Sequence, residues 1–479
     1  MTITFHAART VPKAAKAAVR IVTTDQVGAG VAGVAAKQLE NAGFEGKAGQ
    51  THSWPEDGRV MALVGAGDAS DLDTEAVRRA GAAIGRGFGR HPRIGIELPE
   101  GDVDGTDARR ALAEGVRLGA YTFLTYKSDA KPAKLARVDV AGGSGVRNQA
   151  ALDLGSAIAD GQALARDLVN EPGGTLTAPE FARRAAAMGR KAGLTVKVWD
   201  EAAIKKGKLG GLLGVNRGSE LPPRLVELTY NPKGKAKGTL ALVGKGLVFD
   251  AGGLSIKTGQ GMMTMKCDMG GGAAVVGAMS VMPHLAPQCR VRAFVPMTDN
   301  MLGGDATRPG DVLKIRNGKT IEVLNTDAEG RLILADALSL ASEAKPDAIV
   351  DLATLTGACM VALGPKIAGL MGNNDGWVEQ IEAASTSSDE RVWHLPLPKD
   401  YKKMVESPVA DMKNIGGQYG GALTAGLILQ EFVADGIPWA HLDIAGPAWS
   451  DADEAEITKG GTGFGVRLLA DLAAGFTKP

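Results

Sequence analysis

Short apolar runs alternate with helix-like segments along most of the chain, and this alternation constrains the fold more than any other feature. In the second half the strand-like runs are 196–199, 225–230, 240–243, 291–296, 348–352 and 439–444. Helical patterns such as 272–282, 333–343 and 421–434 separate them. Because strands joined through helices usually run parallel, the pattern predicts an α/β fold, with a mostly parallel (mixed) sheet covered by helices on both faces.

The same alternation occurs earlier, with strand-like runs at 19–22, 60–64, 94–96 and 138–140 and helix-like stretches at 31–41 and 74–87. A chain of 479 residues is too long for one ordinary core, so more than one domain is expected. We assign 1–147 to an N-terminal α/β domain, 148–175 to a linker helix and 176–479 to a C-terminal α/β domain. The polar stretch 127–136 predicts an exposed connection.

Charge and cysteine content exclude several classes of protein. The 54 basic and 54 acidic side chains leave no net charge with which to bind nucleic acid or an anionic membrane. Cys267, Cys289 and Cys359 form no CxxC pair, so neither a disulfide framework nor a thiolate zinc site is indicated. No stretch approaches the roughly 18 apolar residues of a membrane span. We therefore expect a soluble, cytoplasmic protein.

The octapeptide 325–332 reads Asn-Thr-Asp-Ala-Glu-Gly-Arg-Leu and contains Asp327, Glu329 and Arg331. Upstream, a second charged group comprises Lys245, Asp250, Lys257 and Asp268. Any one of these aspartates alone would be explained by a glycine turn. Four carboxylates in segments of small and apolar residues need partners or a metal, and carboxylate oxygens suit divalent ions. The sequence thus predicts a metal site outside the carboxyl ends of the strands, with enough ligands for more than one ion.

The roles of the basic residues in this group can be interpreted in more than one way. Lys257 is either an ordinary surface lysine or a group that stabilises a developing oxyanion. Lys245 could bind metal through a neutral amine. Arg331 either balances Glu329 or holds a small oxyanion such as carbonate.

Three segments, 244–257, 265–271 and 325–332, resemble the signature segments of the cytosol (leucyl) aminopeptidase family in residues, order and spacing. The likeness extends from about Ala165 to the C-terminus and includes 407–411 and 443–446. It implies a metal-dependent aminopeptidase that releases N-terminal residues, preferably Leu- or Met-like ones, from peptides. It also implies two divalent ions per subunit, Zn or Mn, with Mg as an option at the more exchangeable position.

The resemblance assigns a role to each charged residue. One ion would be held by Asp250, Glu329, and the side chain and carbonyl of Asp327; the other would be held by Lys245, Asp250, Asp268 and Glu329. A water activated by both ions would attack the scissile carbonyl, which Lys257 would polarise. Bicarbonate at Arg331 would shuttle protons, and the substrate amine would bind the second metal and Asp268. Met265, Thr354, Gly357 and Ala445 would line the side-chain pocket, although an ordinary core position is an equally open reading for Met265.

The family resemblance further implies a homohexamer, a dimer of trimers, with the N-terminal domain serving oligomerisation or regulation. Two alternatives stay open: an aminopeptidase that also binds DNA as a regulator, and a two-metal hydrolase of another ester or amide. The balanced charge makes nucleic acid an improbable partner. The glycine motif 28–33 matches a dinucleotide fingerprint only weakly, and 317–320 is better explained as a hairpin turn than as a phosphate loop.

Overall fold

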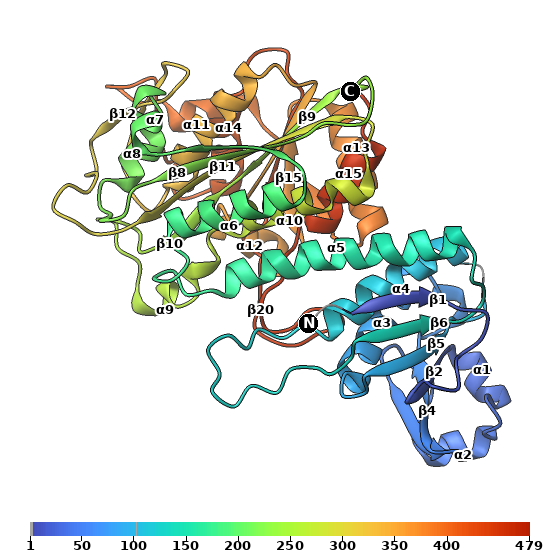
Figure 1. Ribbon diagram of the computed structural model, residues 1–479. Helices are drawn as coiled ribbons and strands as arrows, with labels where there is room; N and C mark the ends of the chain where they lie inside the picture. Colours follow the sequence, from blue (N-terminus) through green and yellow to red (C-terminus); the bar gives the residue numbers. More distant parts are fainter. Residues whose placement is uncertain (1–2, 102) are drawn as a thin grey trace. The chain divides into compact units, whose positions relative to one another are not determined.

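The structure is a computed structural model that describes residues 3–101 and 103–479 (Figure 1). The chain divides into two compact units, which are described separately. The first contains the residues up to Ala163 together with Asp451–Lys459, and the second contains Leu164–Ser450 and Gly460–Pro479. Among the described residues, no helix has the length and apolar character needed to cross a bilayer.

The first unit is built on a six-stranded sheet in the order β1-β6-β5-β2-β4-β3. All neighbours run parallel except β3 and β4, which pair antiparallel. The strands are β1 (Thr4–Ala7), β2 (Ala17–Val22), β3 (Thr51–Glu56), β4 (Arg59–Gly65), β5 (Arg93–Glu97) and β6 (Arg137–Val140). Four of them confirm the predicted strand-like runs, while β1 and β3 were not predicted.

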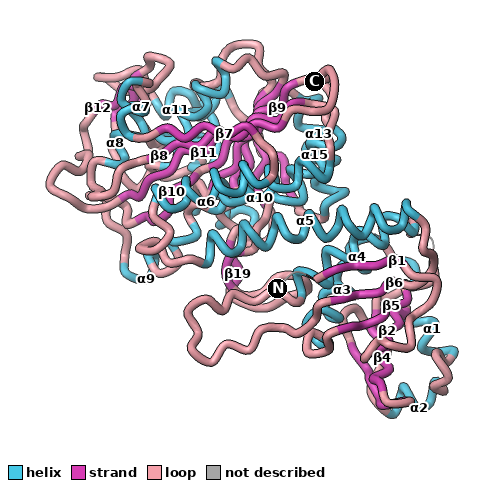
Figure 2. Tube along the Cα trace, viewed as in Figure 1, coloured by secondary structure: helices cyan, strands magenta, loops and turns pink. Residues whose placement is uncertain are grey.

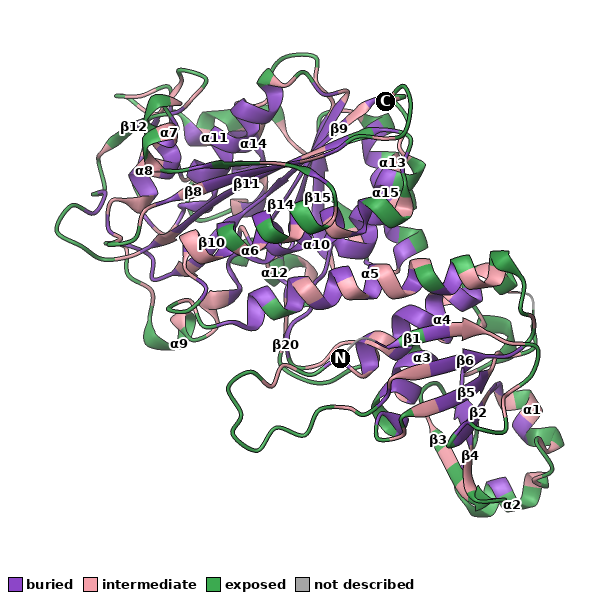
Figure 3. Ribbon diagram, in the orientation of Figure 1, coloured by how far each residue is buried: buried purple, intermediate pink, exposed green. Residues whose placement is uncertain are grey.

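The helices of this unit are α1 (Thr24–Ala29), α2 (Ala36–Asn41), η1 (Ala69–Asp71), α3 (Thr74–Phe88) and α4 (Gly105–Gly119). The helix predicted over 31–41 begins only at Ala36, because Val31 and Val34 instead form an isolated bridge. Gly28 lies inside α1 rather than in a strand-to-helix turn, so the glycine motif lacks the geometry of a dinucleotide site. The long loop between α4 and β6 is mostly exposed, as predicted for 127–136 (Figures 2 and 3).

Helix α5 (Val146–Asn170) confirms the long helix predicted in this region. The division between the two units falls within it, at residues 163 and 164. The assignment of 148–175 as a linker between domains 1–147 and 176–479 remains a prediction.

The second unit is built on a nine-stranded mixed sheet in the order β16-β15-β18-β14-β9-β11-β8-β7, with β10 also paired to β11. Its central strands β18, β14, β9 and β11 are parallel. The strands are β7 (Thr195–Trp199), β8 (Arg224–Tyr230), β9 (Thr239–Gly244), β10 (Gly246–Asp250), β11 (Arg290–Asn300), β14 (Ala348–Ala353), β15 (Ala368–Gly372), β16 (Val392–His394) and β18 (Trp439–Asp443). The predicted mostly parallel, mixed sheet is confirmed.

Helices cover both faces of this sheet. Because successive side chains of a strand point to opposite faces, each central strand contributes residues to two cores. Leu240 and Leu242 join the core under α6 (Ala178–Lys191), α10 (Gly270–Leu285), α13 (Asp375–Ser388) and α15 (Val466–Gly475). Ala241 and Val243 join the opposite core under α8 (Gly210–Asn216), α11 (Gly330–Glu343) and α14 (Gly421–Gln430). Figure 3 shows the strands buried and the outer helix faces exposed. Helix α14 ends before the predicted position 434.

Smaller elements complete the second unit: α7 (Glu201–Lys206), α9 (Gly259–Met262), η2 (Met265–Cys267), α12 (Gly357–Leu363), η3 (Lys399–Val405), β19 (Trp449–Ser450) and β20 (Gly460–Gly461). A separate three-stranded sheet contains β12 (Val312–Lys314), β13 (Thr320–Glu322) and β17 (Met412–Lys413). β12 and β13 pair antiparallel, which confirms the hairpin turn predicted at 317–320. This small sheet holds the chain immediately before the octapeptide 325–332.

Candidate metal centre

The charged residues singled out from the sequence gather outside the carboxyl ends of the central strands. Lys245 directly follows β9, and Asp250 is the last residue of β10. Thr354 directly follows β14. The octapeptide spans the end of the loop between β13 and α11 and the first turn of α11, and Glu329 immediately precedes the helix. This edge of the sheet is where ligands bind in open α/β folds, as the sequence predicted.

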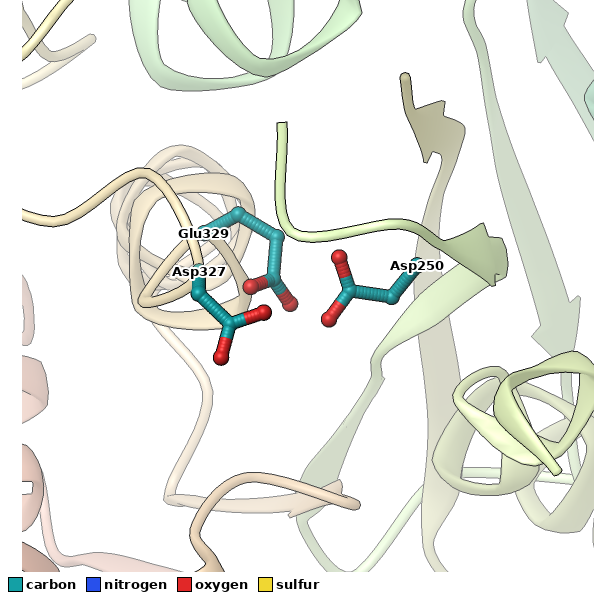
Figure 4. A group of neighbouring side chains, drawn as sticks. All are labelled: Asp250, Asp327 and Glu329. Atoms are coloured by element: carbon teal, nitrogen blue, oxygen red, sulfur yellow. The ribbon is translucent and has the colours of Figure 1, made fainter. Parts of the chain in front are cut away.

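Three carboxylates converge on one point. Asp250, Asp327 and Glu329 each offer one oxygen, and these three oxygens all lie within 4.8 Å of one another. Figure 4 shows the side chains approaching from two directions, Asp250 from the end of a strand and the other two from the start of a helix. Asp250 and Glu329 are buried, so their mutual repulsion is poorly screened by water. A cation at this point would relieve that repulsion.

Lys245 and Asp268 extend the cluster on one side. Lys245 Nζ lies 2.8 Å from Asp268 Oδ1 and 2.8 Å from Glu329 Oε1. It also donates a hydrogen bond to the carbonyl oxygen of Thr354 at 3.1 Å. Both Lys245 and Asp268 are buried, and Asp268 Oδ2 has no hydrogen-bond partner among the described residues. A buried carboxylate oxygen without a partner is costly, which makes this oxygen available to a ligand.

Lys257 lies on the other side of the cluster and is more exposed. Its Nζ is 2.8 Å from Asp250 Oδ2 and 2.6 Å from Asp327 Oδ1. Partial burial alone would lower the pKa of Lys257, but the two carboxylates outweigh it and raise the pKa above the ordinary value. The ammonium group therefore remains protonated at neutral pH, beside the carboxylates and within reach of solvent.

The buried members of the cluster have perturbed protonation equilibria. Burial raises the pKa of the Glu329 and Asp268 carboxyls, the charge of Asp250 adds to this effect, and Lys245 opposes it. Burial also raises the pKa of Asp327. Burial would lower the pKa of Lys245, yet the surrounding carboxylates raise it above that of a free lysine. Perturbed groups concentrated in one site are typical of functional centres.

The octapeptide needs glycine at position 330. A Cβ added there would lie 2.7 Å from Lys245 Nζ and 2.8 Å from its Cε. The side chain of Lys245 thus passes directly over the first residue of α11. Because this lysine is held by two carboxylates, a methyl group at 330 would displace it from its ion pairs.

Neutral side chains join the octapeptide to the segment that follows β10. Thr326 Oγ1 donates to the carbonyl of Gly252 at 2.6 Å and accepts from the Ser255 N–H at 2.8 Å. Asn300, the last residue of β11, donates through Nδ2 to Asp250 Oδ1 at 2.8 Å and to the Thr326 carbonyl at 3.0 Å. Neither of these two side chains was predicted to be a site residue, since uncharged residues carry no signal without an indication of their neighbours.

Arg331 lies on the first turn of α11 and is buried, with 7% of its surface exposed. Its Nη1 donates to the carbonyl oxygen of Asn414 at 2.7 Å. Its Nε has no hydrogen-bond partner among the described residues. A buried guanidinium with an unused donor suits a small oxyanion, one of the two readings that the sequence left open.

The four residues predicted for the side-chain pocket lie on three segments at this edge of the sheet, with Thr354 and Gly357 both on the segment that follows β14. Thr354 is buried, and its hydroxyl donates to Asp268 Oδ1 at 2.7 Å, so it contacts the charged cluster directly. Met265 is half-buried in η2, and Gly357 is exposed at the start of α12. Ala445 follows β18, and its N–H donates to Asp443 Oδ1 at 3.2 Å. Their role in binding substrate remains a prediction.

Comparison with known proteins identifies related families and structures. A family model described as "Cytosol aminopeptidase family, catalytic domain" matches residues 163–470, and one described as its N-terminal domain matches residues 9–130. A probable cytosol aminopeptidase of Rippkaea orientalis is 43% identical over 454 residues, covering 93% of this chain and 92% of the relative. A probable cytosol aminopeptidase of Streptomyces avermitilis is 44% identical over 482 residues, covering 96% of this chain and 93% of the relative.

Solved structures agree with these matches. The bottromycin maturation enzyme BotP in complex with Mn has a TM-score of 0.89 and 41% identity, covering 96% of this chain and 99% of that one. A mutant of tomato leucine aminopeptidase has a TM-score of 0.89 and 33% identity, covering 99% of this chain and 96% of that one. Both similarities span the two units of this chain.

Proposed function

The chain belongs to the cytosol aminopeptidase family, which makes it a metal-dependent aminopeptidase, and we propose that its carboxylate cluster binds two divalent cations and acts on the N-terminal residue of peptides. The observation that carries this proposal is the convergence of Asp250, Asp327 and Glu329, whose oxygens lie within 4.8 Å of one another in a largely buried site. Such a group is costly unless a cation balances it.

The charges of the cluster fit divalent metal. Four carboxylates, Asp250, Asp268, Asp327 and Glu329, form ion pairs with the ammonium groups of two lysines, Lys245 and Lys257. Carboxylate oxygens are suitable ligands for Mn, Mg and Zn. The unpartnered Asp268 Oδ2 supplies a further free ligand atom.

The proposed ligands fall into two overlapping sets. Asp250, Asp327 and Glu329 would hold the first cation, together with the carbonyl oxygen of Asp327. Lys245, Asp250, Asp268 and Glu329 would hold the second, so Asp250 and Glu329 would contribute to both. We propose Zn or Mn as the native ions, with Mg as an option at the second position; one structural relative is described in complex with Mn.

When bound, the cations would supply Lewis acidity and make a water molecule more acidic. The remaining chemistry belongs to residues of this chain. Lys257, whose pKa is raised above the ordinary value, keeps its proton and can donate a hydrogen bond to the scissile carbonyl oxygen as negative charge develops there. Arg331 would hold bicarbonate through its unused Nε donor.

Specificity for the peptide N-terminus is explained by Asp268. The α-amine of a substrate would bind the second cation and the Asp268 carboxylate, and internal peptide bonds and acetylated peptides lack this group. We propose that Met265, Thr354, Gly357 and Ala445 contact the first side chain. A flexible thioether beside small residues suits Leu- or Met-like side chains.

Hydrolysis of a Leu-peptide and of its N-acetylated form tests this proposal. The metal-free protein is supplied with Mn²⁺, and release of the first residue is followed for both substrates. The free peptide should be cleaved about 100-fold faster or more in kcat/KM, since the acetylated form lacks the free amine that would bind the second cation and Asp268. Equal cleavage of the two would refute an amine-anchored aminopeptidase.

Beyond the site itself, we propose that the protein acts on peptides in the cytoplasm as a homohexamer, a dimer of trimers. The names of its relatives refer to the cytosol. Its three cysteines are buried and free, as expected for thiols in a reducing compartment. Oligomerisation or regulation is the role that we propose for the N-terminal domain.

A further inference from the structure

The loop 324–329 carries two of the proposed metal ligands but has no regular secondary structure. It begins two residues after β13 and ends where α11 starts. Backbone N–H and C=O groups in such a partly buried loop must find partners outside a helix or sheet, or their desolvation destabilises the fold. The partners that they find therefore determine the shape of the loop.

One side chain forms four hydrogen bonds with these backbone groups. Asn414 Oδ1 accepts hydrogen bonds from the N–H groups of Leu324, at 2.9 Å, and Asn325, at 3.3 Å. Its Nδ2 donates to the carbonyl oxygens of Asn325, at 2.6 Å, and Ala328, at 3.3 Å. Asn414 has no exposed surface. An amide has two donor hydrogens and two acceptor lone pairs, so this single loop uses all of them.

The backbone of Asn414 adds two contacts that fix its own position. Its N–H donates to the carbonyl of Glu322 at 2.9 Å, which continues the parallel pairing of β13 with β17. Its carbonyl accepts from Arg331 Nη1 at 2.7 Å. Residue 414 thus contacts the chain before, within and after the pair Asp327 and Glu329, without contacting either carboxylate.

We propose that Asn414 is a positioning residue that holds the Asp327–Glu329 loop in the conformation required to bind divalent cations. This inference rests on the proposed function, because it presupposes that the cluster binds metal. Metal sites tolerate little displacement of their ligands, and groups that orient ligands commonly change metal affinity 10- to 100-fold when removed. The Ala328 carbonyl that Asn414 binds lies directly between the two ligand residues.

Asn373, an exposed asparagine, provides a control within the same unit. Its Oδ1 accepts from the Trp439 N–H at 2.7 Å, and its Nδ2 donates to the Ile437 carbonyl at 3.1 Å. It is also an asparagine that bridges two backbone groups of a connecting segment. It lies beyond the carboxyl end of β15, which runs antiparallel to β18, so it is at the edge of the sheet opposite the carboxylate cluster.

The test measures binding of Mn²⁺ alone to the metal-free protein by titration calorimetry. Asn414→Ala should bind Mn²⁺ at least 10-fold more weakly than the wild type, and Asn373→Ala should bind within twofold of it. Hydrogen exchange at the Leu324 and Asn325 amides should accelerate only in the Asn414 variant. If Asn414→Ala does not fold, Asn414→Ser serves instead, since its hydroxyl and a water molecule can replace part of the lost hydrogen bonding.

Folded Asn414 variants that bind Mn²⁺ within twofold of the wild type would overturn the inference. Equal weakening by Asn373→Ala would also overturn it, because the effect would then be a general consequence of lost stability. Failure of the wild type itself to bind Mn²⁺ would instead refute the proposed function. The two ideas can therefore fail separately.

Discussion

Gly330 carries no functional group, yet it determines how closely Lys245 approaches the carboxylates. The lysine side chain lies over this residue and joins Asp268 to Glu329. Asn300 and Thr326 act in a comparable way, orienting the acidic groups and their loop through hydrogen bonds. At the scale of single residues, the site depends as much on small and neutral side chains as on charged ones.

Gly330→Ala should weaken cation binding more than it weakens the fold. The new methyl group would lie 2.7 Å from Lys245 Nζ and push the lysine away from its two carboxylates. We expect at least a 10-fold loss of Mn²⁺ affinity by calorimetry. Gly304→Ala is the control, because a Cβ there meets nothing within 4 Å. Unchanged affinity in Gly330→Ala would show that Lys245 does not need its present position.

Lys257→Ala should lower turnover without lowering the amount of bound metal. Lys257 contacts Asp250 and Asp327 but is not a proposed ligand of either cation. Its protonated amine is proposed to stabilise the developing oxyanion. Loss of such a donor typically lowers kcat by about 10²–10³. Bound metal, measured by elemental analysis, should remain near the wild-type level. Parallel losses of turnover and metal would place Lys257 in cation binding instead.

The charged residues of the site could be predicted from the sequence, and the neutral ones could not. Asp250, Asp327 and Glu329 lie together as expected, because carboxylates near strand ends in apolar segments need a cation or cationic partners to balance their charge. Asn414 is more than 80 residues from the loop that it binds, and a lone asparagine is normally a turn or surface residue. Its function depends on a strand pairing that local sequence does not specify.

At the scale of structural elements, the site is formed by loops at one edge of a mixed sheet. The parallel neighbours β9 and β14 end beside one another and are followed directly by Lys245 and Thr354, and β10, which pairs with β11, ends at Asp250. The small sheet of β12, β13 and β17 positions the octapeptide from the side. Rigid strands with short loops give ligand positions that flexible loops alone would not.

Cation binding at this edge should release protons. Glu329, Asp268 and Asp327 have carboxyl pKa values raised by burial, and the pKa of Lys245 is raised by its carboxylate neighbours. With a pKa raised to about 8, Glu329 retains its proton near neutral pH, as does the Lys245 ammonium group, and these ligand atoms must lose their protons to bind metal. Mn²⁺ affinity should therefore increase as pH rises from 6 to 8.5. Calorimetry in two buffers of different ionisation enthalpy measures the released protons; no release would contradict the proposed ligand set.

Six strands of the large sheet were predicted correctly because they appear as short apolar runs between helices. The strands β7, β8, β9, β11, β14 and β18 all confirm these runs. The short strands β12, β13 and β17 were not predicted, since two or three residues carry no periodic signal. Elements held mainly by long-range pairing thus escape local sequence patterns, and the small sheet beside the octapeptide is one of them.

At the scale of the whole molecule, the chain is proposed to assemble as a homohexamer. Multi-angle light scattering during size-exclusion chromatography should give a mass of about six times the 49.3 kDa of one chain. A trimer that associates further at higher concentration would agree with a dimer of trimers. A monomer at all concentrations, with full peptidase activity, would contradict the proposed assembly.

The central claim is that the carboxylate cluster binds two divalent cations on which peptide hydrolysis depends. Titration of the metal-free protein with Mn²⁺, with bound ions counted per chain while Leu-peptide hydrolysis is followed, tests it most directly. The proposed ligand sets predict two bound ions per chain, no turnover without metal, and loss of both binding and turnover in Glu329→Gln. Hydrolysis by the metal-free protein, or full activity in Glu329→Gln, would contradict the claim.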